Sequence, residues 1–173
     1  MQTSHAAVLT VVKNDIPELV TLINNAYRGQ GWTNESHLLR GSARINNEVL
    51  ATELEAPGAL MLKSVDEKGV ITGCVYLQKK NTSLYLGMLS VLPGIQSKGT
   101  GSLLLNASEN YAREQGCTKI TIQVISVRHE LIDWYQRRGF YLTGETAPFP
   151  TDDRFGIPVQ PLAFAVLEKK TGN

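Results

Sequence analysis

Apolar residues recur along this chain with two different periods, and the changes of period predict its elements. Apolar side chains recur every three or four residues over 16–27, 99–115 and 129–138, which predicts three amphipathic helices. Alternating or β-branched apolar residues predict strands at 7–12, 59–65, 70–79, 83–92, 119–127, 140–145 and 162–168. The order of these elements predicts a mixed α/β fold.

Two segments follow neither a clear helix nor a clear strand pattern. The polar stretch 32–58 is predicted to be mostly helical, and 146–161 is predicted to be one irregular loop because it holds four prolines. Asp15 is predicted to cap the first helix, and Gly116 and Gly139 to end the other two. A loop as long as 146–161 within a compact domain usually has a function, so we expect it to contribute to a binding or catalytic site.

Composition and charge exclude several classes of protein. The chain has 173 residues, of which 42% are hydrophobic, enough for one domain with its own core. Its 17 Lys and Arg against 16 Asp and Glu leave a net charge of +1, so neither a nucleic-acid partner nor disorder is expected. The sequence has no membrane-spanning run or secretory signal, which predicts a cytoplasmic protein without a membrane partner. Cys74 and Cys117 are expected to be buried free thiols.

The segment from Val91 to Gly101 carries the clearest chemical signal. A strand ends at Pro93, a glycine-containing loop follows, and a helix begins near Gly99. The N–H groups of a helix's first turn have no acceptor inside the helix, and the helix dipole is positive there. Such a turn binds anions, and its glycines let a phosphate approach the backbone, so the segment predicts a phosphate site.

Two common phosphate-binding loops do not fit this segment. A P-loop requires a lysine directly after its last glycine, but Thr100 stands there and Lys98 precedes Gly99. A dinucleotide fingerprint requires a third glycine where this chain has Leu104, and an acidic residue in the next strand, which 118–127 lacks. The phosphate site therefore belongs to another architecture.

The pattern that does fit is Gln-x-x-Gly-x-Gly, formed by Gln96, Gly99 and Gly101 behind a Val-x-Pro strand end. Downstream, a short helix carries Tyr135 and closes with Gly139 and the phenylalanine after it. Together these motifs resemble the GNAT superfamily of acyl-CoA-dependent N-acyltransferases. The resemblance covers most of the chain and implies one domain over 1–173, with a strongly twisted mixed sheet of six to seven strands and four to five helices. Its central parallel pair would splay open for the cofactor.

The resemblance also implies acetyl-CoA as cosubstrate and no metal. The loop amides would hold the pyrophosphate, and the preceding strand would bind the pantetheine arm and supply a backbone N–H for the oxyanion. Arg128 stands where the family often has asparagine, and Lys98 is either a charge near the phosphates or a solvated surface lysine. The implied cofactor-binding residues are Leu89, Ser90, Val91, Gln96, Ser97, Lys98, Gly99, Thr100, Gly101, Ser102, Arg128 and Tyr135.

Acetyl transfer from a thioester to an amine requires a free amine, oxyanion donors and a proton for the departing thiolate. Tyr135 is predicted to be the general acid, because a phenol with a pKa near 10 stays protonated at neutral pH. The alternative is that Tyr135 is only a core aromatic. The strand 83–92 has no acidic residue, so the base stays open among Glu35 and Glu145, followed by Asp152, Asp153 and His129.

The resemblance implies an acceptor pocket built by the first helices and the late loop. Its candidate residues are Tyr27, Trp32, Arg40, Arg44, Phe149 and Asp152. Aromatic groups with both signs of charge suit a small polar or zwitterionic amine, and a peptide amine stays open as an acceptor. We thus predict an acetyltransferase acting by direct attack, with a homodimer as a further partner that the resemblance allows. The alternative is a catalytically silent acyl-CoA-binding or sensing module of the same fold.

Overall fold

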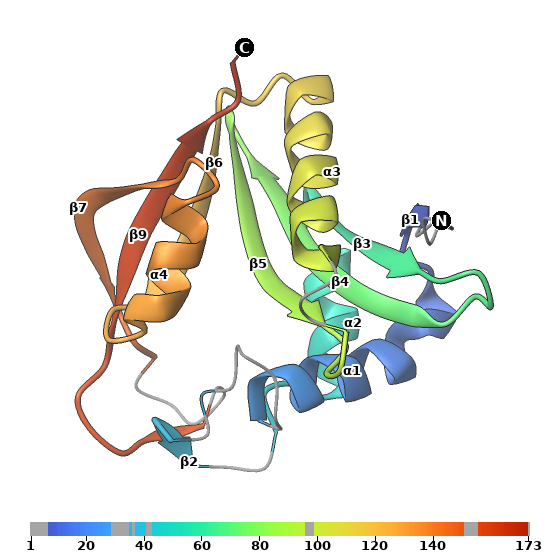
Figure 1. The fold of residues 1–173 in the computed structure, drawn as a ribbon, viewed down its shortest axis with the longest axis horizontal. Coiled ribbons are helices and arrows are strands. Elements are labelled where there is room, and N and C mark those ends of the chain that lie inside the picture. The colour runs from blue at the N-terminus through green and yellow to red at the C-terminus, as the bar shows by residue number, and fades with distance from the viewer. Residues whose placement is uncertain are drawn as a thin grey trace.

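The computed structural model describes residues 7–28, 35, 37–40, 43–95, 99–150 and 156–172. Seven strands form one mixed sheet in the order β1–β3–β4–β5–β6–β9–β7 (Figure 1). These strands are β1 (Ala7–Thr10), β3 (Ala59–Val65), β4 (Ile71–Lys80), β5 (Ser83–Val91), β6 (Lys119–Ile125), β7 (Tyr141–Pro148) and β9 (Ala163–Lys170). The α-helices are α1 (Ile16–Arg28), α2 (Asn47–Glu55), α3 (Thr100–Glu114) and α4 (His129–Gln136). The predicted mixed α/β class is confirmed.

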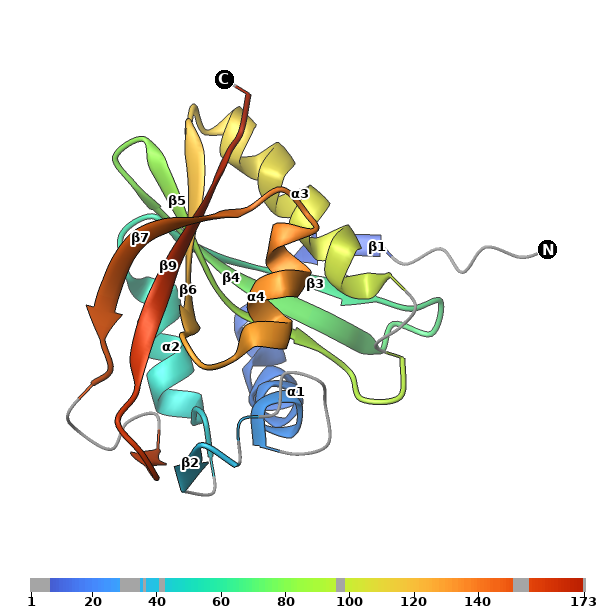
Figure 2. The same cartoon turned by 60° about the vertical axis from the view of Figure 1, so that its left-hand side comes forward.

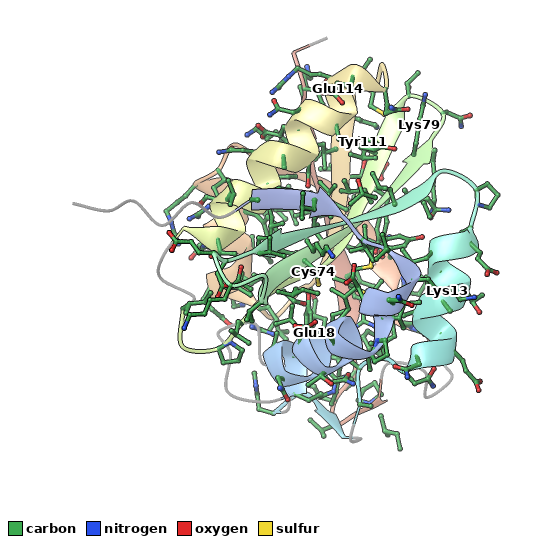
Figure 3. All side chains as sticks on the ribbon, turned by 90° about the vertical axis from the view of Figure 1, so that its right-hand side faces the viewer. Lys13, Glu18, Cys74, Lys79, Tyr111 and Glu114 are labelled. Atoms are coloured by element: carbon green, nitrogen blue, oxygen red, sulfur yellow. The ribbon has the colours of Figure 1, made fainter. Side chains whose placement is uncertain are left out.

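Helices cover both faces of the sheet. Val75 and Leu77 of β4 pack with α3 and α4, whereas Cys74 and Tyr76 pack with α1 and α2. This division arises because successive side chains of a strand point to opposite faces. Figure 3 shows Cys74 inside the molecule, and both Cys74 and Cys117 are buried free thiols, as predicted. Within the described ranges, no helix is long and apolar enough to cross a membrane.

The stretch 32–58 is less helical than the sequence predicts. Where it is described, its helix is α2, which begins after Asn46, whose side chain accepts a hydrogen bond from the N–H of Val49 at 2.8 Å. Before it lies β2 (Leu39–Arg40), which pairs with β8 (Ile157–Pro158) in a second, antiparallel sheet. These short strands form where segments distant in sequence meet, and local periodicity carries no signal for such a meeting.

Two more predicted features differ in the structure. The predicted loop 146–161 begins as strand, because β7 continues through Pro148 opposite β9, and it holds β8. A proline is tolerated in β7 because this strand is an edge of the sheet. Asp15 does not cap α1 directly but lies in a 3-10 turn, η1 (Lys13–Asp15), where its carboxylate accepts the N–H of Val12 at 2.9 Å.

β5 and β6 form the parallel pair of the sheet, and they separate after a short contact. Residues 83–85 of β5 pair with 119–121 of β6. Beyond these pairs β5 follows β4 as far as Val91, while β6 follows β9 as far as Ile125. The two strands therefore diverge, as Figure 1 shows, and the resemblance predicts this splayed pair. Beyond residue 85, the edge of β5 is not paired with β6.

Candidate active site

A cleft of about 420 Å³ lies between the diverging parts of β5 and β6. Its walls come from α1, α2 and the segment before it, β4, β5, β6, α4, β9 and the residues around the end of β7. The fold thus gathers side chains from both halves of the chain around one opening. The sequence-predicted residues that line it are Tyr27, Glu35, Arg44, Leu89, Arg128, Tyr135 and Phe149.

Tyr135 reaches the cleft from α4 and is almost completely buried, with 6% of its surface exposed. Its ring packs edge to face against Trp134 and Phe140, at centroid distances of 5.0 and 5.4 Å. Burial, together with the nearby Tyr27 and Tyr85, raises the pKa of the Tyr135 phenol well above its ordinary value. The hydroxyl is therefore protonated at neutral pH and available as a hydrogen-bond donor.

The first turn of α3 presents the predicted phosphate site. Gly99 precedes the helix with a left-handed φ of +83°, and its carbonyl accepts the N–H of Leu103 at 2.9 Å. A Cβ at Gly99 would meet none of the described residues within 4 Å. Glycine is thus required by conformation and leaves the backbone approachable. Three predicted contacts of the loop lie outside the described residues: Gln96, Ser97 and Lys98.

Gly101 has a second role that the sequence does not reveal. A Cβ at this position would lie 3.1 Å from the indole ring of Trp134. Glycine therefore lets the start of α3 approach α4, and Figure 2 shows the two helices side by side there. A side chain at Gly101 would disturb this packing in addition to any phosphate contact. A substitution at Gly99 therefore tests the phosphate site with less disturbance of the packing between α3 and α4.

Arg138, just after α4, brings a positive charge to the same turn. Its guanidinium lies over the Trp134 ring, 3.7 Å from the centroid, and its Nε donates to Ser102 Oγ at 3.1 Å. Partial burial lowers its pKa, but an arginine remains charged at neutral pH. The sequence does not indicate a role for Arg138, because its position between two motif residues does not show that it reaches the start of α3.

Arg128 lies at the start of α4 and is buried, with 3% of its surface exposed. Its Nε donates to the carboxylate of Glu130 at 3.0 Å. Hydrogen bonds from the backbone of Glu130 itself and from Arg128 lower the pKa of the Glu130 carboxyl. Arg128 lines the cleft, so a charged group stands where the resemblance implies a polar contact with the cofactor.

The carboxylates predicted as bases lie in different surroundings. Glu35 is buried in the cleft wall and not in a helix, and its carboxylate forms an ion pair with Arg28. Glu145 is exposed on β7 and is not among the residues that line the cleft, which leaves it badly placed for a base. Four further predicted positions fall outside the described residues: Trp32, Asp152, Asp153 and the side chain of Arg40.

Glu53 of α2 also lines the cleft, although no motif in the sequence points to it. The Tyr76 hydroxyl donates to the backbone carbonyl of Glu53 at 3.0 Å, which ties α2 to β4. Burial, with the negative charge of Glu53, raises the pKa of Tyr76 to about 12. In the sequence, Glu53 is one of several acidic residues on a polar stretch, and only the packing of α2 on the sheet selects it.

A mixed sheet with a splayed parallel pair is the architecture that the resemblance implies for acyl-CoA-dependent N-acyltransferases. Residues 21–140 match the model of the acetyltransferase (GNAT) family, and the chain belongs to this family. A curated relative, streptothricin acetyltransferase from Streptomyces lavendulae, is 33% identical over 64 residues, covering 37% of this chain. The match spans about a third of that relative's own length, namely 34%.

Solved structures share the fold over nearly the whole chain. The ribosomal-protein-S18-alanine N-acetyltransferase from Escherichia coli has a TM-score of 0.72 at 15% identity, covering 98% of this chain and 96% of its own. The protein yncA from Salmonella typhimurium, solved with its cofactor acetyl-CoA, has a TM-score of 0.70 at 18% identity, with the same coverage of 98% and 96%. At such identities these likenesses show the fold alone.

Proposed function

We propose that this protein transfers the acetyl group of acetyl-CoA to a primary amine. The observation that carries the proposal is the edge of β5 beyond its pairing with β6, which borders the cleft and leads toward the first turn of α3. A strand edge binds an extended chain through its N–H and C=O groups, and a helix N-terminus binds phosphate. These two features suit the pantetheine amides and the pyrophosphate of CoA. Membership of the acetyltransferase family supports the same cofactor.

The cofactor would be held by local features rather than by the charge of the whole chain. CoA is strongly anionic, whereas the net charge of the protein is only +1. The backbone of 99–102 and the guanidinium of Arg138 would meet the pyrophosphate, and 96–98 would complete the loop as the resemblance implies. The acetyl end would then lie beside Leu89, with a backbone N–H of 89–91 stabilising the oxyanion.

Tyr135 is proposed to protonate the departing thiolate. Its raised pKa keeps the phenol in the donor form, but that pKa also lies well above the value of about 8.5 for an ordinary thiol. Complete transfer of the proton from the phenol to a fully solvated thiolate would therefore be thermodynamically unfavourable. In the cleft, desolvation makes the sulfur more basic, so the phenol would donate a hydrogen bond as charge develops and release its proton as the C–S bond breaks.

The raised pKa of Tyr135 leads to a prediction about alkaline pH. Because the phenol ionises only well above its usual value, Tyr135 should supply its proton throughout the range from about pH 7 to 9.5. The rate should rise with pH as the amine acceptor loses its proton and should then form a plateau. The measurement is kcat against pH for the wild type and for Tyr135→Phe. An alkaline fall within this range that is present only in the wild type would contradict the assignment.

Direct attack by the amine is the proposed route, without an acetylated enzyme. Cys74 lies close to the cleft strand, with Sγ 4.0 Å from the carbonyl of Met88. Burial raises the pKa of the Cys74 thiol to about 12, so it remains protonated and is a poor nucleophile. The base that frees the amine is proposed to be Glu53, because Glu35 is engaged by Arg28.

The acceptor is proposed to be a small polar or zwitterionic amine. Arg44 and Glu53 bring opposite charges to the cleft, and Tyr27 and Phe149 supply aromatic walls. The guanidinium of Arg44 lies over the Tyr27 ring, 5.6 Å from its centroid. A carboxylate of the acceptor would meet Arg44, and its ammonium group would lie toward Glu53 before it loses a proton.

The proposed function is tested first by binding and then by turnover. Acetyl-CoA at a hundred times its Kd is expected to stabilise the protein by about 2.7 kcal/mol, measured as a thermal shift. Thiol release should then be followed over a panel of amino acids, simple amines and peptide N-termini, and zwitterionic amines should be the best substrates. No stabilisation by acetyl-CoA would contradict the proposal. Stabilisation without thiol release for any amine would favour the acyl-CoA-binding module instead.

A further inference from the structure

Three tyrosines, one each from α1, β4 and β5, line the cleft. The hydroxyl of Tyr27 donates to the carbonyl of Leu89 at 3.0 Å. The hydroxyl of Tyr76 donates to the carbonyl of Glu53, also at 3.0 Å. The hydroxyl of the third, Tyr85, has no hydrogen-bond partner in the part of the chain that the structure describes. Of these three phenols, Tyr85 is therefore the one that can offer its hydroxyl to a bound molecule.

The ring of Tyr85 is held in place by its neighbours on the sheet. It packs edge to face against the Tyr76 ring, at a centroid distance of 6.4 Å, and Lys80 Nζ lies 5.4 Å from its centroid. A Cβ at Gly87 would lie 3.0 Å from the Tyr85 hydroxyl oxygen, so the ring leans along β5 and the glycine leaves room for it. A phenylalanine could make the same ring contacts, so packing alone does not require the hydroxyl.

Charged side chains of both signs lie near this hydroxyl. Burial raises the pKa of the Tyr85 phenol, the charge of Arg44 opposes this rise, and the charge of Glu53 adds to it. The phenol is therefore a hydrogen-bond donor at neutral pH. All three residues also line a side chamber of about 120 Å³ that shares most of its walls with the cleft. A carboxylate only accepts hydrogen bonds, so a guanidinium and a phenol hydroxyl in one chamber suit it.

The position of the hydroxyl limits how far a carboxylate can lie from the reacting amine. The hydroxyl lies beside Gly87, and the acetyl group is proposed to lie beside Leu89. These two residues are at most about 7 Å apart, because a strand rises about 3.4 Å per residue. A hydrogen bond of about 2.8 Å and an approach of about 3 Å between the amine and the acetyl carbon take up most of that distance. The amine and the carboxylate must therefore be attached close together.

We infer that Tyr85 is a specificity-determining residue, whose hydroxyl donates a hydrogen bond to the carboxylate of an α-amino acid bound beside Arg44. This role rests on the proposed function and deepens it, because it selects amino acids over amines that lack a carboxylate. Glu53, the proposed base, lines the same chamber and can receive the ammonium group of the same molecule. The two charges of the acceptor would thus meet groups of opposite polarity within one chamber.

Tyr85→Phe is the first test, because it keeps the ring and removes only the hydroxyl. The substrates are the best amino acid of the acceptor panel and the amine that its decarboxylation gives. The KM for the amino acid is expected to rise about twentyfold, as for loss of one hydrogen bond to a charged group. Its kcat should stay within about twofold, since the bond is present in the ground state and the transition state alike. For the decarboxylated amine, both constants should stay within about twofold. An equal change for the two substrates would overturn the role of Tyr85.

Tyr76→Phe is the matched control for selectivity. It removes a hydroxyl from the neighbouring ring, but that hydroxyl is bound to the backbone of Glu53 on α2 and not offered to the cleft. The control should lose thermal stability and change the kinetic constants of the amino acid and of the amine by the same factor. A loss of selectivity as large as that in Tyr85→Phe would show that the effect is not specific to the Tyr85 hydroxyl, and it would overturn the assignment.

An equilibrium measurement tests the same contact without turnover. The amino acid is titrated calorimetrically into the protein that already holds free CoA, which carries no acetyl group to transfer. The Kd of the amino acid is expected to rise about twentyfold in Tyr85→Phe. The Kd of CoA itself should stay within about twofold, because Tyr85 lies at the acceptor end of the cleft. An unchanged Kd for the amino acid would overturn the carboxylate contact.

The outcomes also separate this role from the proposed function. No acetyl transfer by the wild type to any amine of the panel would refute the proposed function. Turnover of amino acids with the same selectivity in the wild type and in Tyr85→Phe would refute only the role of Tyr85. Wild-type activity confined to amines without a carboxylate would refute that role as well, and acetyl transfer to a primary amine would stand.

Discussion

Replacing Tyr135 by phenylalanine is expected to lower kcat about a hundredfold while changing the affinity for acetyl-CoA by less than about twofold. The variant keeps the ring that packs between Trp134 and Phe140, so the core around α4 is preserved. It removes the only group that Tyr135 contributes to the proposed chemistry, the hydroxyl that protonates the thiolate. The measurements are kcat from thiol release and Kd from a binding titration with acetyl-CoA.

Tyr111→Phe provides the matched control. Tyr111 of α3 packs against the same core cluster as Tyr135, and burial raises the pKa of its phenol too, but it does not line the cleft. Figure 3 labels Tyr111 on α3, toward the helix end that carries Glu114. The control is expected to retain the wild-type kcat. Wild-type turnover by Tyr135→Phe would show that Tyr135 is a core aromatic and not the acid.

Replacing Gly99 by valine is expected to weaken acetyl-CoA binding about a hundredfold, which corresponds to losing one or two charge-assisted hydrogen bonds. Gly99 has the left-handed φ of +83° that valine adopts only with strain, and a Cβ there would lie beside the first turn of α3 with none of the described residues within 4 Å. That space is where a phosphate must approach the backbone N–H groups. Isothermal titration with acetyl-CoA measures the change.

Gly116→Val controls for the strain. Gly116 follows the other end of α3 with a φ of +72°, and a Cβ there also meets nothing within 4 Å in the part of the chain that the structure describes. Both variants should therefore lose a similar thermal stability, about 1–3 kcal/mol, whereas only Gly99→Val should lose affinity. Equal affinities in the two variants would remove the phosphate site from the start of α3 and, with it, the main support for the cofactor assignment.

The main elements of the fold are predictable because their signals are local. The apolar spacing of Leu19, Ile23 and Ala26 predicts α1, and all three residues are fully buried. The apolar run 70–79 predicts a strand, which the structure confirms as β4, with Val75 and Tyr76 packed in separate core clusters. The β2–β8 pair escapes prediction, because neither short segment has a period of its own and each is a strand only through the other.

The candidate site divides in a similar way. Motifs point to both Tyr135 and the turn at Gly99. Each motif lies within a single strand–helix unit, where the spacing between its residues is short and regular. Glu53 and Arg138 are missed, because the place of Glu53 in the cleft wall and the contact of Arg138 with Ser102 both depend on segments that lie tens of residues away. Glu145 shows the opposite error, since a late acidic residue is a plausible base in the sequence but is exposed on β7 outside the cleft.

The sequence by itself determines the α/β order of this protein, its GNAT resemblance, and the positions of Tyr135 and of the turn that is predicted to bind phosphate. Periodicity and turn chemistry are properties of neighbouring residues, and a linear pattern records them fully. Only the tertiary structure decides where β5 and β6 part, that Glu35 is bound by Arg28, and that Tyr27 holds the carbonyl of Leu89. These features depend on contacts between distant segments, whose geometry is set by packing of the whole chain.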